Sequence, residues 1–183
     1  ARLGTEAFAA HQAAMNILSI SFSFGDGMQV AAVALIGRSL GEKRPQLARL
    51  YGQICQRIGN VISLAVSVFF LLGGRFLYQI YFDEPHIVDM GVTLVRVIVL
   101  IVIVQIAQVI YMGCLRGAGD VIFTTIASTV SVTIIRTAVS YGMCYVAGLG
   151  LVGIWLGILA DQISRFLFTS WRFKSGKWTR IRI

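Results

Sequence analysis

Long apolar runs, separated by short polar or glycine-containing breaks, dominate the pattern of this chain. The runs cover residues 13–36, 55–82, 90–115, 121–147 and 149–171. Each is close to or above the roughly 20 residues that an α-helix needs to cross the hydrocarbon core of a bilayer. Runs such as 97–104 do not alternate between apolar and polar positions, as the strands of a membrane barrel do. The pattern therefore predicts an all-α protein, a polytopic bundle of about five transmembrane helices.

Composition supports the same class of protein. Of the 183 residues, 57% are hydrophobic and only 13% are charged, and the mean hydropathy is +0.79. Soluble domains carry about a quarter charged residues. So few charges cannot coat the surface of a soluble globule of this composition, and the excess of apolar surface must face lipid.

Basic residues gather in alternate breaks between the runs, and the formal net charge is +8. They are Arg38, Lys43, Arg44, Arg49 and Arg57 after the first run, Arg116 after the third, and Arg172, Lys174, Lys177, Arg180 and Arg182 in the C-terminal basic tail 172–183. Lysine and arginine collect on the cytoplasmic side of membrane proteins. We therefore expect the 38–57 loop and the C-terminus to be cytoplasmic in a multi-pass protein of the plasma or inner membrane.

The basic face also suggests a partner. Anionic lipid headgroups are the expected counter-charge, because the basic residues lie beside membrane-crossing segments. Nucleic acid is not expected, since no basic stretch interleaves with aromatic residues in a soluble domain. Five spans with a cytoplasmic C-terminus would place Ala1 outside, yet the sequence has no signal peptide and no initiator Met. We therefore expect at least one preceding helix.

Three stretches carry a family resemblance. They are "AFAAHQAAMNILSISFSFGDGMQVAAVALIGRSLGEKRPQLAR", then "FDEPHIVDMG" leading through an apolar run to "LRGAGD", and finally "GLGLVGIWLGILADQISRFLFTSWRFKSGKW". In this order and spacing they resemble the C-terminal lobe of the multidrug and toxic compound extrusion (MATE) transporters. The resemblance implies helices eight to twelve of a twelve-helix, two-lobe fold. Residues 1–183 would be a partial six-helix lobe, without its first helix and without the N-terminal lobe, its expected partner.

The resemblance implies a function as well. A secondary antiporter of this kind exports organic, mostly cationic compounds in exchange for Na⁺ or H⁺, by alternating access between its two lobes. No cofactor is expected beyond that coupling ion. A lipid or lipid-linked oligosaccharide flippase of the same superfamily and a non-transporting membrane scaffold remain alternatives. An enzyme is not expected, because no catalytic motif is present, and Cys55, Cys114 and Cys144 match neither a disulfide framework nor a metal site.

Charged side chains inside the apolar runs are the first candidates for an ion or substrate pathway, because they are costly in lipid. Asp26 lies midway along the first run between two glycines, and is either a proton or cation site or a water-lined residue at a helix bend. Arg136 is too deep in the fourth run to reach either surface easily. Its nearest candidate partner is Asp161, and Arg165 follows one turn later on the same face. We expect an Arg136–Asp161–Arg165 network that either holds the bundle together or relays coupling.

Uncharged polar residues give further candidates. Gln105 and Gln108, three residues apart, lie toward one interface and serve either interhelical hydrogen bonds or the ion pathway. Some MATE proteins carry an acidic residue where Gln105 stands, so the coupling carboxylate of this protein is expected either in the N-terminal lobe or at Asp26. The fourth run is rich in hydroxyl groups, which favour either close helix packing or a cavity-lining face. They belong to Thr124, Thr125, Ser128, Thr129, Ser131, Thr133, Thr137 and Ser140.

Overall fold

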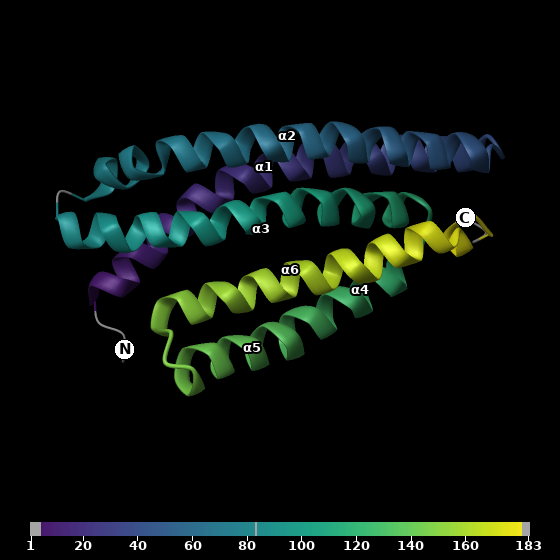
Figure 1. The fold of residues 1–183 in the computed structure, drawn as a ribbon. Coiled ribbons are helices and arrows are strands. Elements are labelled where there is room, and N and C mark those ends of the chain that lie inside the picture. Colours follow the sequence, from purple (N-terminus) through teal and green to yellow (C-terminus); the bar gives the residue numbers. More distant parts are fainter. Residues whose placement is uncertain (1–4, 83, 181–183) are drawn as a thin grey trace.

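Helices make up almost all of the part of the chain that the computed structural model describes, residues 5–82 and 84–180 (Figure 1). The long helices are α1 (Thr5–Gly41), α2 (Pro45–Tyr81), α3 (Pro85–Gly117), a fourth over Val121–Val146, and α6 (Gly150–Ser175). Within these described ranges, 5 helices are long and apolar enough to cross a membrane. The all-α, five-span prediction is confirmed.

The fourth helix is not a uniform α-helix. It consists of α4 (Val121–Val130), the π-helical segment η1 (Ser131–Arg136), α5 (Thr137–Tyr141) and a second π-helical segment, η2 (Gly142–Val146). Wider π turns are rare inside helices and are frequent at functional sites. The apolar run at 121–147 predicts the length of this helix but gives no sign of its two wide segments.

The segment 38–57, expected to be a loop, is instead a helical hairpin. α1 continues to Gly41, the turn occupies only residues 42–44, and α2 begins at Pro45. Lys43 takes a left-handed backbone conformation (φ 57°) that reverses the chain. Proline favours the first position of a helix because its φ is already helical and its missing N–H is not needed there. Of the basic residues of this segment, Lys43 and Arg44 therefore lie in the turn, and Arg38, Arg49 and Arg57 lie on the two helices.

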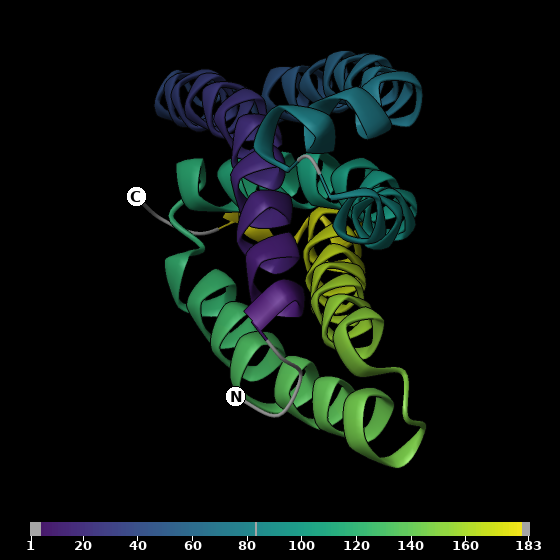
Figure 2. The same ribbon diagram turned by 90° about the vertical axis from the view of Figure 1, so that its left-hand side faces the viewer.

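α3 is the central helix of the bundle. α1 and α2 pack against it, α6 packs against it from another direction, and the fourth helix lies along α6 (Figure 1). Half of the most apolar stretch of α3 (50%) is buried inside the protein, against 17% for the fourth helix. Seen from the end, the N-terminal half of α1 runs past α5 and α6 (Figure 2). The least covered helix is therefore the one with the π-helical segments.

Two glycines of α3 fix its closest approach to a neighbouring helix. A Cβ atom at Gly113 would lie 2.7 Å from the carbonyl oxygen of Gln29 in α1, and one at Gly117 would lie 2.6 Å from that of Val33. Glycines four residues apart share one helix face and let two backbones meet. Because the obstacle is backbone rather than a flexible side chain, the crossing of α1 over α3 requires glycine at both positions.

α2 contacts the bundle through one stripe of mostly small residues. The stripe comprises Ala48, Gly52, Cys55, Gly59, Ser63, Ser67, Phe70, Gly74 and Tyr78. Tyr78 fills the space left by Gly91 of α3 and donates its hydroxyl to the carbonyl oxygen of Ala10, 3.3 Å away. The other side of α2 exposes apolar residues such as Leu64 (61%) and Leu72 (83%). An exposed apolar helix face of this kind suits contact with lipid.

The basic end of the bundle is closed by an ion pair. The side chain of Asp120 does not cap α4; its Oδ2 instead accepts a hydrogen bond from Arg172 Nε at the end of α6, 2.6 Å away. The guanidinium of Arg172 also lies over the ring of Phe123, 5.1 Å from its centre. Trp178, in the short turn η3 (Lys177–Arg180), is fully buried and stacks on Phe173. The described part of the tail is thus folded onto the helices.

Alanine at Gly113 should destabilise the protein by about 1–3 kcal/mol, because the backbones of α1 and α3 must separate to admit the methyl group. Alanine at Gly73 is the matched control, since a Cβ atom there meets nothing within 4 Å. Thermal unfolding of the purified protein in detergent, followed by a thiol-reactive dye, measures both. Equal stability of the two variants would contradict the close crossing.

Asp120→Asn should cost about 1–3 kcal/mol, since it leaves the charge of Arg172 without its partner in a region where the two side chains are only 7% and 21% exposed. Glu42→Gln is the control, because it breaks the Arg38–Glu42 pair, whose side chains are 81% and 41% exposed, and should not change the melting temperature measurably. A destabilisation no larger at Asp120 than at Glu42 would show that the pair does not hold α4 to α6.

Candidate functional site

Five polar side chains lie in the middle of α3 and α6, and we call them the polar layer. They are Gln105 and Gln108 of α3, with Asp161, Gln162 and Arg165 of α6. Gln105 and Asp161 are fully buried. Buried polar groups within membrane spans are costly unless they are paired, and they usually mark function.

The two helices bring these residues to one height in the bundle. α3 and α6 run in the same direction, and the ring of Tyr111 lies 5.9 Å from that of Phe166 and 5.2 Å from that of Phe173. Both helices rise by about 1.5 Å per residue. Tyr111 is therefore level with about residue 170 of α6, and counting back places Gln108 and Gln105 level with about residues 167 and 164, within one turn of Arg165 and Asp161.

Asp161 is the most unusual member of the polar layer. Its Oδ2 accepts a hydrogen bond from the Arg165 guanidinium, 2.6 Å away, so the pair expected from their spacing is present. Its other oxygen, Oδ1, is buried and has no hydrogen-bond partner among the described residues, and neither does Arg165 Nε. A buried carboxylate oxygen without a partner is costly. It is also free to accept a proton or coordinate a cation.

The glutamine amides also lack most of the hydrogen bonds that they could form among the described residues. Gln108 donates only to the sulfur of Met112, 3.8 Å away, which is a weak contact. Within the described ranges, Gln105 has no partner for either amide atom, and Oε1 of both Gln108 and Gln162 has none. Four buried side-chain oxygens without partners among the described residues, counting Asp161 Oδ1, therefore occur within about two helical turns of each other along the bundle.

Asp26 lies outside the polar layer. Its side chain is exposed on α1, and the neighbouring Gly27 has open space around its Cα. Asp26 thus shares neither the burial of Asp161 nor its arginine partner. The two spanning carboxylates singled out from the sequence occupy different environments.

The expected link from Arg136 to Asp161 is wrong. Arg165, one turn along the same helix, binds one oxygen of the carboxylate, and no described residue makes a hydrogen bond to the other oxygen. At η1 it is Ser131 that faces α6, where its hydroxyl accepts a hydrogen bond from Ser164, 2.8 Å away. Arg136, at the end of the same wide segment, is directed elsewhere.

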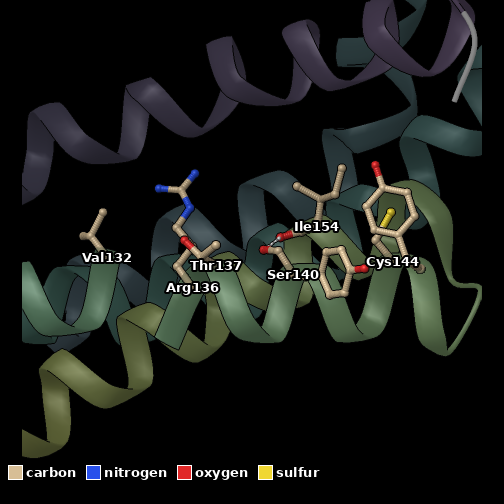
Figure 3. A pocket seen from close by; sticks show the side chains of 8 residues that line it. Val132, Arg136, Thr137, Ser140, Cys144 and Ile154 are labelled. Carbon is tan, nitrogen blue, oxygen red and sulfur yellow. Dashed lines mark hydrogen bonds between the residues drawn. The ribbon is translucent and has the colours of Figure 1, made fainter. Parts of the chain in front are cut away.

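Arg136 instead lines a pocket of about 480 Å³, which we call the Arg136 pocket. Its walls are Val132, Arg136, Thr137, Ser140, Tyr141, Cys144, Tyr145 and Ile154 (Figure 3). The arginine extends away from its helix, on the side along which α1 runs (Figure 3). Small-molecule sites commonly enclose about 300–1,000 Å³ and combine apolar walls with a few polar groups. The pocket has these properties.

The hydroxyl-rich pattern of the fourth run anticipates part of this pocket, through Thr137 and Ser140. The two tyrosines were missed by the sequence reasoning, although Tyr141 and Tyr145 are four residues apart and their rings lie 5.3 Å from each other. That spacing is the signal that could have found them. Gln162 was also missed by the sequence reasoning.

Metal chemistry finds no support in the described part of the chain. No three histidine, cysteine, aspartate or glutamate residues within it are placed to hold a metal ion. Cys55, Cys114 and Cys144 are all buried and unbridged.

Comparison with known proteins identifies the family. A family model described as MatE matches residues 1–142. The probable multidrug resistance protein NorM of Thermotoga maritima is 31% identical, over 97% of this chain and 38% of its own length. The multidrug resistance protein NorM of Burkholderia vietnamiensis is 28% identical, over 93% of this chain and 38% of its own length.

A solved structure shares the fold. The eukaryotic MATE transporter AtDTX14 superposes with a TM-score of 0.88 at 16% sequence identity, over 96% of this chain and 39% of that one. The chain therefore spans well under half the length of the proteins it matches. Because the family match covers most of the sequence and the five spanning helices superpose on a MATE transporter, this chain belongs to the MatE family of membrane transporters and is not an enzyme.

Proposed function

We propose that this chain is the C-terminal lobe of a secondary antiporter that exports organic, mostly cationic compounds in exchange for Na⁺ or H⁺. The names of its relatives support drug export, since several are called multidrug resistance proteins. The chain covers only 38% of those relatives, so the proposal includes an N-terminal lobe as its working partner. Transport then proceeds by rocking one lobe against the other.

The observation that carries the proposal is the state of Asp161. Its side chain is fully buried in a spanning helix, with one oxygen bound by Arg165 and the other without a hydrogen-bond partner in the described part of the chain. A proton or cation at Oδ1 neutralises the carboxylate and weakens its attraction for Arg165. A coupling ion must stabilise one conformation more than another, and a change in this pair provides such a difference.

Gln105 and Gln162 fit the same role. Both place amide oxygens without partners at the height of Asp161, and oxygen ligands suit hard cations such as Na⁺. Glutamine cannot take up a proton at the position where some MATE proteins have an acid. In the proposed mechanism the exchangeable charge is therefore supplied by Asp161, with Asp26 on the exposed side of α1 as the second candidate.

The proposal also gives the orientation in the membrane. The 38–57 hairpin and the C-terminal end of α6 carry the clustered arginines and lysines, which are retained on the cytoplasmic side of the plasma or inner membrane. Anionic lipid headgroups balance their charge in the inner leaflet.

Asp161→Asn should reduce ion-driven efflux about tenfold or more, because the exchanged charge is lost. The measurement uses the full-length protein, with this chain as its C-terminal lobe, reconstituted in vesicles. Efflux of a cationic dye is followed under an imposed Na⁺ or H⁺ gradient. Asp89→Asn is the matched control, since that carboxylate is 68% exposed and its ion pair with Arg75 is long, at 3.9 Å.

Two further variants separate coupling from folding. Asp161→Asn with Arg165→Gln removes both charges, so it should restore thermal stability without restoring ion dependence. Asp26→Asn tests the second candidate. If this variant loses ion-driven efflux while Asp161→Asn keeps it, the coupling site lies on α1. Wild-type vesicles that show no gradient-driven efflux would refute the antiporter itself.

A further inference from the structure

Arg136 carries a charge deep in a membrane span without a carboxylate to balance it. It lies 15 residues after the start of the helix Val121–Val146 and 10 residues before its end, or about 15 Å from the nearer end. Among the side chains that the structure describes, those of residues 8–82 and 84–179, none is joined to its guanidinium by an ion pair or hydrogen bond. An arginine at this depth requires a partner of opposite charge.

Of the described carboxylates on the neighbouring helices, Asp161 is paired with Arg165 and Asp120 is paired with Arg172. Asp26 of α1 is exposed and makes no ion pair with Arg136. Among the described side chains, an electrostatic interaction with Arg136 is evident for His11 of α1, and its ring carries no negative charge. None of the described side chains around the pocket therefore supplies an anion to Arg136.

The rest of the pocket is suited to an organic molecule rather than to a bare ion. Tyr141 and Tyr145 are 64% and 57% exposed and contribute aromatic rings, while Thr137 and Ser140 contribute hydroxyl groups. Ser140 already donates to the carbonyl oxygen of Ile154, 3.4 Å away, and its oxygen can still accept a hydrogen bond. Aromatic rings bind flat organic molecules, and a guanidinium binds a carboxylate through two parallel hydrogen bonds.

The backbone at the pocket is also unusual. Val132 and Arg136 belong to η1, and Cys144 and Tyr145 belong to η2, so a π-helical segment lies at each end of the pocket wall. Wide turns of this kind are frequent at functional sites. This feature is independent of the charge on Arg136 and coincides with it in space.

We propose that the Arg136 pocket binds the carboxylate of aromatic substrates, so that the transporter accepts zwitterions as well as simple cations. This inference rests on the proposed function. Arg136 pairs with the carboxylate, the two tyrosines contact the aromatic rings, and the hydroxyl groups of Thr137 and Ser140 bind the remaining polar atoms. Arg136 thereby sets specificity for one class of substrate and takes no part in ion coupling.

The test compares two substrates that differ in one group, a rhodamine dye with a free carboxylate and the methyl ester of the same dye. Arg136→Gln in the full-length protein should lower the efflux of the carboxylate form about tenfold or more, because a charge-assisted hydrogen bond is lost. Efflux of the ester should change less than about twofold, since it makes no such bond. Arg136→Lys should recover part of the difference, because it keeps the charge but not the two-pronged geometry.

Arg75→Gln is the matched control, since this arginine is 66% exposed, lies outside the pocket and should leave both dyes unaffected. Equal loss of both dyes in Arg136→Gln, or loss of neither, would overturn the proposal. Failure of the wild-type protein to export either dye would instead count against the proposed function. Because the ester reports on the same protein in the same vesicles, a folding defect cannot imitate the selective loss.

Binding provides a second measurement. Quenching of the carboxylated dye by the purified full-length protein in detergent should show an affinity about tenfold weaker for Arg136→Gln, with the affinity for the ester retained. Vesicles enriched in phosphatidylglycerol should not compete with the carboxylated dye. Competition by this lipid would assign the pocket to a lipid phosphate and overturn the substrate proposal.

Discussion

The close crossing of α1 over α3 is the constraint on which the rest of the bundle depends. Lipid tails are as apolar as the helix surfaces, so helices in a bilayer gain little from hiding apolar area against each other and must instead pack tightly. Gly113 and Gly117 allow that packing, because backbone atoms of α1 lie where their side chains would be. In the described part of the chain, α3 touches each of the other spanning helices. The position of α3 therefore sets the positions of all of them.

This central position explains where polar groups collect. α3 and α6 meet at the middle of the bundle, and side chains in that interface are removed from both water and lipid, as the full burial of Gln105 and Asp161 indicates. A paired polar group there is stabilised more strongly than at a surface, and an unpaired polar group there costs more free energy. The same tight packing that holds the helices in register thus makes the interface responsive to a single added charge.

Much of this arrangement could be predicted from the sequence, and the failures have physical causes. Apolar run length predicted all five spans, since bilayer thickness sets helix length, and four-residue spacing predicted the Asp161–Arg165 pair. The direction of Arg136 could not be predicted, because it depends on two π-helical segments that no propensity reveals. The Asp120–Arg172 pair could not be predicted either, because its two members are 52 residues apart in the sequence, beyond the reach of local rules.

The two π-helical segments have a consequence for comparing this chain with its relatives. A π turn holds more residues than an α turn, and it commonly arises where a residue has been inserted into a helix. Gaps in an alignment of the fourth helix therefore belong within the membrane, near 131–136 and 142–146, and not in the loops where they are customarily placed. Placing the gap in a loop instead shifts every residue between that loop and the π-helical segment by one position, which is about 100° around the axis, and matches lipid-facing positions with pocket-facing ones.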